Sequence, residues 1–337
     1  MPFPSGSSKP ARGFLSLERM SQVAENFADR LVAAIRQKRT PACVGIDPVY
    51  QRLPAQIAEY REFNDESDSE AALDAVLEYC RRVIRLVAPL VPAVKINSAY
   101  FERYYWEGME GYFGLIQEAA DLGLVVIGDC KRADVGHTAE MYARSSLADP
   151  DFVDLEGYRG PDAVTVNPYL GYDGVRPFID VARAQNKGVF VLVRTSNESA
   201  SQVQGFTSGD GLTLADHVAR LVGLWSADDG LVGRSGYSCV GAVVAPRDRE
   251  SALRLRALMS QSLLLVPGFG AQGITADLVA PCFKSDGSGA LISASRCVIY
   301  AYENARYVEL YPSDWEKCVQ AACKDFVTEL AGVVSVS

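Results

Sequence analysis

The sequence holds few of the residues from which metal centres and hydrolytic triads are built. Among its 337 residues are two histidines, His137 and His217, and eight cysteines that form no Cys-x-x-Cys pair. A histidine-based metal site and a Ser-His-Asp triad both depend on histidine, so we expect neither of them, and no bound metal. Scattered cysteines are typical of reduced, buried thiols, which predicts a cytoplasmic protein.

Two further absences narrow the range of partners. No apolar stretch reaches the roughly 18 residues that cross a bilayer. The opening "MPFPSGSSKPARG" has no apolar signal core, so we expect residues 1–18 to be a disordered lead-in. The formal net charge of −9 argues against a nucleic-acid-binding or membrane-binding face. An anionic small molecule stays open as a ligand, because a few local cations are enough to bind it.

What the sequence does have is a regular alternation of two patterns. Short apolar runs rich in β-forming residues are separated by longer segments with helical spacing. The eight runs cover residues 42–47, 92–97, 124–129, 163–167, 189–195, 239–245, 263–268 and 290–295. Helices with one buried face are predicted by two sets of apolar residues, Met20, Val23, Phe27, Leu31 and Ile35, and Leu73, Val76, Leu77, Cys80, Val83, Ile84 and Val87.

Eight apolar strands separated by helices indicate a parallel sheet covered by helices. The fold class that we predict is α/β, a single-domain (β/α)8 TIM barrel, with a doubly wound open sheet as the alternative. We expect residues 19–337 to form this barrel. The segment "DWEKCVQAACKDFVTELAGVV" (314–334) is expected to be a C-terminal closing helix.

Charged residues stand where the third predicted strand ends, in "GDCKRADVGHT" (128–138). Residues two apart on a strand share a face, so Asp129 and Lys131 are expected to point the same way and Cys130 the other way. Lys95 on the neighbouring strand can join them. A lysine between carboxylates keeps its proton, which makes it a fixed cation and a possible general acid. A salt-bridged turn would give the same pattern, but the place at a strand end favours a site.

The last two predicted strands point to a phosphate site. Gly268, Gly270 and Gly273 allow the backbone to approach a ligand closely, and Arg296 follows the eighth strand. Barrels of this kind often bind phosphate in the loops after strands seven and eight. Backbone N–H groups together with one guanidinium would hold a phosphate dianion. An ordinary turn and a surface ion pair are the alternatives for these residues.

The ordered motifs of the chain resemble those of orotidine 5'-phosphate decarboxylases, in particular the longer bacterial type with "NPYLG". The resemblance covers roughly residues 20–305 and rests on "GIDP" (45–48), "VKIN" (94–97), "DCKRAD" (129–134), "VTVNPYLGYDG" (164–174), "RTSN" (194–197), "PGFGAQG" (267–273) and "SR" (295–296). It implies a cofactor-independent conversion of orotidine 5'-monophosphate to uridine 5'-monophosphate.

The resemblance also implies a set of catalytic residues. Lys131 would be the proton donor to C6 of the pyrimidine, and Asp129 the carboxylate beside the substrate carboxylate. Lys95 and Asp134 would complete an alternating Lys-Asp-Lys-Asp array. In the family the last aspartate and the threonine four residues on come from the partner subunit, so Asp134 and Thr138 would act across a homodimer interface.

Substrate-binding residues follow from the same resemblance. Asp47 would bind the ribose hydroxyls, and Ser196 would read the amide edge of the pyrimidine. Gln272 and Arg296 would contact the phosphate. The conformations of loops 196–211 and 267–274 stay open, because "SNES" and "AQGI" depart from the family's usual sequences.

Other readings of the chain remain. Magnesium-dependent sugar-phosphate decarboxylases and aldolases share the Asp-x-Lys-x-x-Asp pattern and look to carry a carboxylate at the end of strand two. Here that position is Lys95, a cation that should repel a metal ion. A non-catalytic phosphate-ligand-binding barrel is the other alternative. Arg194 is left as either a ligand contact or a supporting ion pair, and for Asn167 a structural role is favoured.

Overall fold

The structure is a computed structural model that describes residues 25–57, 68–155, 157–270 and 273–334. The predicted lead-in of residues 1–18 lies outside this part of the chain. So do Met20 and Val23, which belong to the first predicted helix, and Gln272, the predicted phosphate contact.

Eight parallel strands close into a barrel in sequence order. The prediction of a (β/α)8 barrel is therefore confirmed, and the doubly wound open sheet is wrong because β1 pairs with β8. Nearly every strand residue is buried, since side chains on one face fill the barrel and those on the other pack against helices. The strands are β1 (Ala42–Ile46), β2 (Ala93–Asn97), β3 (Val125–Arg132), β4 (Ala163–Val166), β5 (Gly188–Arg194), β6 (Ser238–Val244), β7 (Ser262–Pro267) and β8 (Ala290–Ala294).

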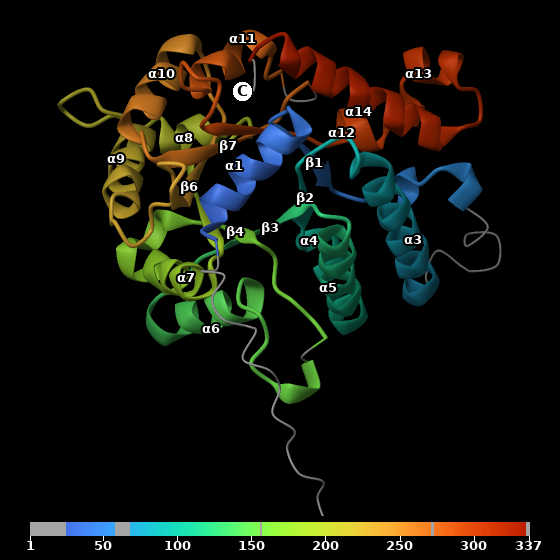
Figure 1. Ribbon diagram of the computed structural model, residues 1–337, viewed down its shortest axis with the longest axis horizontal. Helices are drawn as coiled ribbons and strands as arrows, with labels where there is room; N and C mark the ends of the chain where they lie inside the picture. Colours follow the sequence, from blue (N-terminus) through green and yellow to red (C-terminus); the bar gives the residue numbers. More distant parts are fainter. Residues whose placement is uncertain (1–24, 58–67, 156, 271–272, 335–337) are drawn as a thin grey trace, which may run out of the picture.

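Helices form the outer layer around the strands, as Figure 1 shows. In the described residues they are α1 (Phe27–Lys38), α3 (Ser69–Val87), α4 (Ala99–Glu102), α5 (Tyr105–Asp121), α6 (Gly136–Ser146), α7 (Tyr172–Gln185), α8 (Ala200–Gln204), α9 (Leu214–Ser226), α10 (Arg249–Leu258), α11 (Ala276–Val279), α12 (Arg296–Ile299), α13 (Ala305–Leu310) and α14 (Trp315–Ala331). Short 3-10 turns lie at Tyr50–Arg52, Ala55–Ile57, Val153–Leu155, Pro168–Leu170, Ala280–Cys282 and Ala301–Glu303.

Several of the helices begin where a side chain caps their free N–H groups. Asp68 precedes α3 and accepts hydrogen bonds from the backbone N–H groups of Glu70 and Ala71. The seven apolar residues that predicted this helix are all buried on its inner face. Asn26 caps α1 by accepting from the N–H of Ala28, so this helix starts at Phe27.

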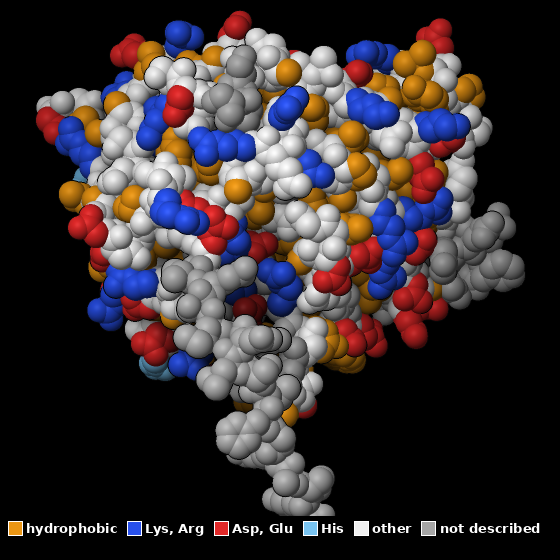
Figure 2. Space-filling view, viewed as in Figure 1, with side chains coloured by type: hydrophobic (Ala, Val, Ile, Leu, Met, Phe, Trp, Pro, Cys, Tyr) orange, Lys and Arg blue, Asp and Glu red, His pale blue; other side chains and the backbone are white. Residues whose placement is uncertain are grey.

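The C-terminal helix α14 packs against α3 and the start of the barrel. Trp315 at its first turn contacts the ring of Tyr79 on α3, with 5.3 Å between the ring centroids. None of the helices in the described ranges is long and apolar enough to cross a membrane. On the face shown in Figure 2, acidic and basic side chains are interspersed, so that face carries no continuous basic surface of the kind that binds nucleic acid.

Candidate active site

The carboxyl ends of the strands surround a cavity of about 200 Å³. Six of the predicted site residues line it, namely Asp47, Lys95, Asp129, Lys131, Ser196 and Arg296. They come from five different βα units, so the closed barrel is what brings them together. This position at the C-terminal face is where barrel enzymes carry their active sites.

Three charged side chains form a continuous row at the centre of the cavity. Lys95 Nζ lies 2.7 Å from Asp129 Oδ2, and Lys131 Nζ lies 2.6 Å from Asp129 Oδ1. Lys95 Nζ is also 3.7 Å from Asp47 Oδ1. Asp129 therefore has one ammonium group on each carboxylate oxygen. The Lys131 side chain is 47% exposed, so its charged end reaches the open part of the cavity.

Burial and neighbouring charge act in opposite directions on these groups. Burial alone would raise the pKa of Asp129, but Lys95 and Lys131 outweigh it and hold that pKa well below its usual range. Burial alone would lower the pKa of Lys95, but Asp129 and Asp47 raise it above its ordinary value. Asp129 is therefore a fixed anion and Lys95 a fixed cation at neutral pH.

The end of β3 differs from the regular strand that the sequence predicted. The strand continues three residues beyond Asp129, and its pairing with β4 shifts register between Gly128 and Arg132. Lys131 has a φ of 46°, in the left-handed region that residues other than glycine rarely adopt. The side chains of Lys131 and Asp129 do meet, as predicted. The cause is this irregular backbone and not the simple alternation of a regular strand.

Thr165 on β4 is a site residue that the sequence reasoning missed. Its hydroxyl donates to Asp129 Oδ1 at 2.9 Å and accepts from the backbone N–H of Lys131 at 3.0 Å. The residue is 1% exposed and lines the cavity. The available signal was a hydroxyl in the middle of the otherwise apolar run "AVTV".

The opposite end of the cavity is formed after β7 and β8. Gly268 and Gly270 have φ values of 90° and 72°, so the turn after β7 requires glycine at both positions. Arg296 is the first residue of α12 and lines the same cavity as Gly268. Exposed backbone and one guanidinium are suited to an anionic group such as phosphate.

The segment after β5 is held in place by Gln204 of α8. Gln204 Oε1 accepts from the backbone N–H of Thr195 at 2.9 Å and from Arg194 Nη1 at 2.8 Å. Its Nε2 donates to the Thr195 hydroxyl at 2.7 Å. Arg194 thus supports the loop that carries Ser196 and does not line the cavity.

Asn167 also has a structural role, as favoured from the sequence. Its side-chain oxygen accepts from the backbone N–H of Tyr169 at 3.1 Å and caps the 3-10 turn Pro168–Leu170.

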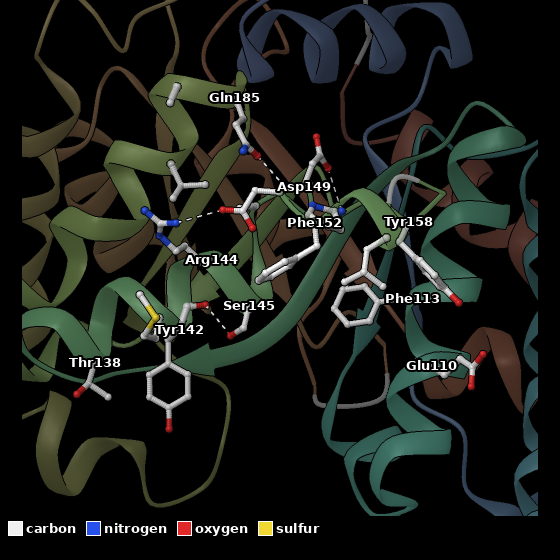
Figure 3. Close-up of a pocket in the computed structure, with 18 residues that line it drawn as sticks. Glu110, Phe113, Thr138, Tyr142, Arg144, Ser145, Asp149, Phe152, Tyr158 and Gln185 are labelled. Carbon is white, nitrogen blue, oxygen red and sulfur yellow. Dashed lines mark hydrogen bonds and ion pairs between the residues drawn. The ribbon is translucent and has the colours of Figure 1, made fainter. Parts of the chain in front are cut away.

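Asp134 and Thr138 are not brought into the cavity of their own chain. Asp134 accepts a hydrogen bond from the backbone N–H of Val135 at 2.8 Å, and neither residue lines the cavity. Thr138 instead borders a separate groove of about 940 Å³ on the outside of the barrel. Figure 3 shows this groove between α5, α6 and α7, with Thr138 and Tyr142 on α6 and Phe152 across from them.

Metal-ligating side chains are not clustered in the described ranges, where no group of three or more His, Cys, Asp or Glu residues is placed to hold a metal ion. Lys95, the middle residue of β2, carries an ammonium group that already pairs with two carboxylates.

Comparisons with known proteins agree in their result. Residues 42–311 match the family described as "Orotidine 5'-phosphate decarboxylase / HUMPS family". An orotidine 5'-phosphate decarboxylase of Rhodopirellula baltica is 38% identical over 309 residues, covering 91% of this chain and 99% of that protein. One of Caldicellulosiruptor saccharolyticus is 36% identical over 311 residues, covering 92% and 99%. The solved OMP decarboxylase of Leishmania donovani superposes with a TM-score of 0.65 at 28% identity, covering 91% and 98%.

Replacing Asp129 by asparagine is expected to change how stability depends on pH. The pKa of Asp129 in the folded protein lies below the value of about 3.9 in an unfolded chain. The ionised carboxylate therefore stabilises the fold in full above about pH 5, and this stabilisation is lost as the pH falls through the folded pKa.

Urea unfolding followed by tryptophan fluorescence measures this effect. The free energy of unfolding of the wild type, taken relative to that of Asp129→Asn, should rise between about pH 3 and pH 5 and then stay level to about pH 6. A difference that does not vary over this range would contradict the charge state assigned to Asp129.

Proposed function

The chain belongs to the orotidine 5'-phosphate decarboxylase / HUMPS family, and from this premise we propose how its cavity works. The protein is a carboxy-lyase that converts orotidine 5'-monophosphate to uridine 5'-monophosphate, the last step of pyrimidine nucleotide synthesis. The observation that carries this reading within the family is the buried Lys95 of β2, paired with Asp47 and Asp129. A cation at this place opposes the binding of a metal ion. The magnesium-dependent sugar-phosphate enzymes would require such an ion.

We propose that the substrate lies with its phosphate toward Gly268 and Arg296, and its pyrimidine ring toward Ser196 and Lys131. Asp47 would bind the ribose hydroxyls. In support, Asp47 lines the cavity and its side chain is 20% exposed, so its carboxylate can accept a hydrogen bond from a ligand hydroxyl. Gln272, which lies outside the described residues, would add a second contact to the phosphate.

In the proposed reaction the bond between C6 and the carboxylate carbon breaks, and carbon dioxide leaves. The electron pair stays on C6, and the proposed reaction uses no cofactor to delocalise it. The Lys131 ammonium stabilises this charge electrostatically and then transfers one proton to C6. The neutral amine regains a proton from solvent, which its exposed side chain can reach.

Asp129 and Lys95 prepare Lys131 for this step. Asp129 holds the ammonium group 2.6 Å from its Oδ1 and places a negative charge next to the substrate carboxylate. Lys95 neutralises Asp129 from the other side, which keeps the buried carboxylate ionised. Binding energy from the remote phosphate would hold the substrate in this arrangement.

We further propose a homodimer in which Asp134 and Thr138 complete the partner's site. The single chain supports this because neither residue lines its own cavity, while both lie at or near the start of α6. Thr138 borders a groove with exposed apolar side chains, including Met141 and Phe152, which are 53% and 65% exposed. Apolar surface of this kind is typical of protein interfaces.

We also propose that residues 19–337 act as one catalytic domain and that the protein is cytoplasmic. All eight cysteines are free thiols, and six of them are buried. Free thiols are typical of a reducing compartment.

Lys131→Ala is expected to remove nearly all turnover of orotidine 5'-monophosphate. The variant loses both the charge that stabilises the carbanion and the proton donor, so kcat should fall by about 10⁴-fold or more. The phosphate and ribose contacts remain, so uridine 5'-monophosphate should still bind in calorimetry. The exposed Lys324 of α14 offers a matched control, since Lys324→Ala should leave kcat unchanged. Wild-type turnover by Lys131→Ala would show that another group is the acid.

Mixing two inactive variants tests whether Asp134 acts across the dimer. Lys131→Ala and Asp134→Ala should each be nearly inactive alone. After the subunits exchange, each mixed dimer has one site with an intact Lys131 and an intact Asp134 from different chains. Random mixing should restore about a quarter of wild-type activity, measured per subunit. If the mixture stays inactive while mixed dimers are detected by native mass spectrometry, Asp134 does not act in trans.

A further inference from the structure

Strand β3 carries two more residues than β4 where the two strands pass the cavity. Gly128 pairs with Val164, and the next pair is Arg132 with Val166, so four steps along β3 correspond to two steps along β4. Such a bulge interrupts the ladder of backbone hydrogen bonds and redirects the side chains within it. The bulge contains both Asp129 and Lys131.

Within the bulge, the backbone N–H of Lys131 donates a hydrogen bond to the Thr165 hydroxyl on β4 at 3.0 Å. Thr165 stands on β4 directly opposite the bulge, between Val164 and Val166. Because a buried N–H group is costly to leave unpaired, this contact favours the left-handed backbone that Lys131 adopts.

The same hydroxyl also fixes the orientation of the Asp129 carboxylate. It donates its proton to Oδ1 at 2.9 Å, the oxygen that also binds Lys131 Nζ at 2.6 Å. The other oxygen, Oδ2, accepts from Lys95 Nζ at 2.7 Å. Each carboxylate oxygen of Asp129 therefore binds one lysine. Thr165 contacts both the backbone N–H of Lys131 and Oδ1, the oxygen that binds the Lys131 ammonium group.

We propose that Thr165 is a positioning residue of the reaction, which acts by holding Lys131 and Asp129 in the geometry that proton transfer requires. This inference rests on the proposed function of Lys131 as the acid. The hydroxyl sets the direction of the Lys131 side chain through its backbone, and the rotation of the Asp129 carboxylate through Oδ1. Thr165 itself exchanges no proton with the substrate.

Two substitutions separate the hydroxyl from the packing of the side chain. Thr165→Val keeps the shape and removes the hydrogen bonds, whereas Thr165→Ser keeps the hydroxyl and removes a methyl group. A misplacement of catalytic groups by about 1 Å costs on the order of 100-fold, so kcat of Thr165→Val should fall by about 100-fold. Since the phosphate and ribose contacts are untouched, KM should change by less than about threefold. Thr165→Ser should recover most of the lost kcat.

Thr40→Val is the matched control, because Thr40 is equally buried and its hydroxyl has no hydrogen-bond partner in the described structure. It should leave kcat and KM unchanged. Wild-type kcat in Thr165→Val would overturn the inference. Equal losses of kcat in the Val and Ser variants, accompanied by lower melting temperatures, would also overturn it, since they would show a packing role.

A crystal structure of Thr165→Val tests the inference independently of the substrate. We expect Lys131 to leave the left-handed region and its Nζ to separate from Asp129 Oδ1; an unchanged Lys131 would overturn the inference. If the wild type itself failed to decarboxylate orotidine 5'-monophosphate, the proposed function would be wrong, but this structural result would still decide whether Thr165 positions Lys131.

Discussion

The site depends on a buried carboxylate held between two ammonium groups. Asp129 is 7% exposed, and a charge so far from water is costly unless it is paired. Lys95 on β2 and Lys131 on β3 supply that pairing, and the Asp47 carboxylate pairs with Lys95 as well. The pKa of Asp129 is lowered and that of Lys95 is raised by their neighbours of opposite charge, so both stay charged. The array is therefore ready before substrate arrives, which is what electrostatic stabilisation of a short-lived carbanion requires.

The barrel could be predicted from the sequence because strands buried on both faces leave a strong signal. Eight apolar runs, each close to the observed strand, are enough to indicate the fold, and the residues that end these runs mark the cavity. Positions that depend on the register of a neighbouring strand could not be predicted in this way. The bulge at Lys131 and the role of Thr165 follow from the register between β3 and β4, and local spacing does not contain that register.

Residues outside the cavity hold the loops around the site in place. Gln204 and Asn167 lie near the ends of β5 and β4 and hold the loops that follow them. Such supporting contacts involve polar side chains that look like ordinary loop residues in a sequence. Asp134 and Thr138 are a different case, since one chain alone does not place them at its cavity. Thr138 borders the apolar groove beside α6, which supports the proposal that a second subunit completes the site.

The central claim is that this cavity decarboxylates a pyrimidine nucleotide without a metal ion. The most direct measurement is the loss of pyrimidine absorbance when the purified protein meets orotidine 5'-monophosphate in excess chelator. The account predicts a rapid loss, with uridine 5'-monophosphate as the product. No loss in chelator, together with magnesium-dependent turnover of a sugar phosphate, would contradict it and assign the chain to the metal-dependent members of the same barrel.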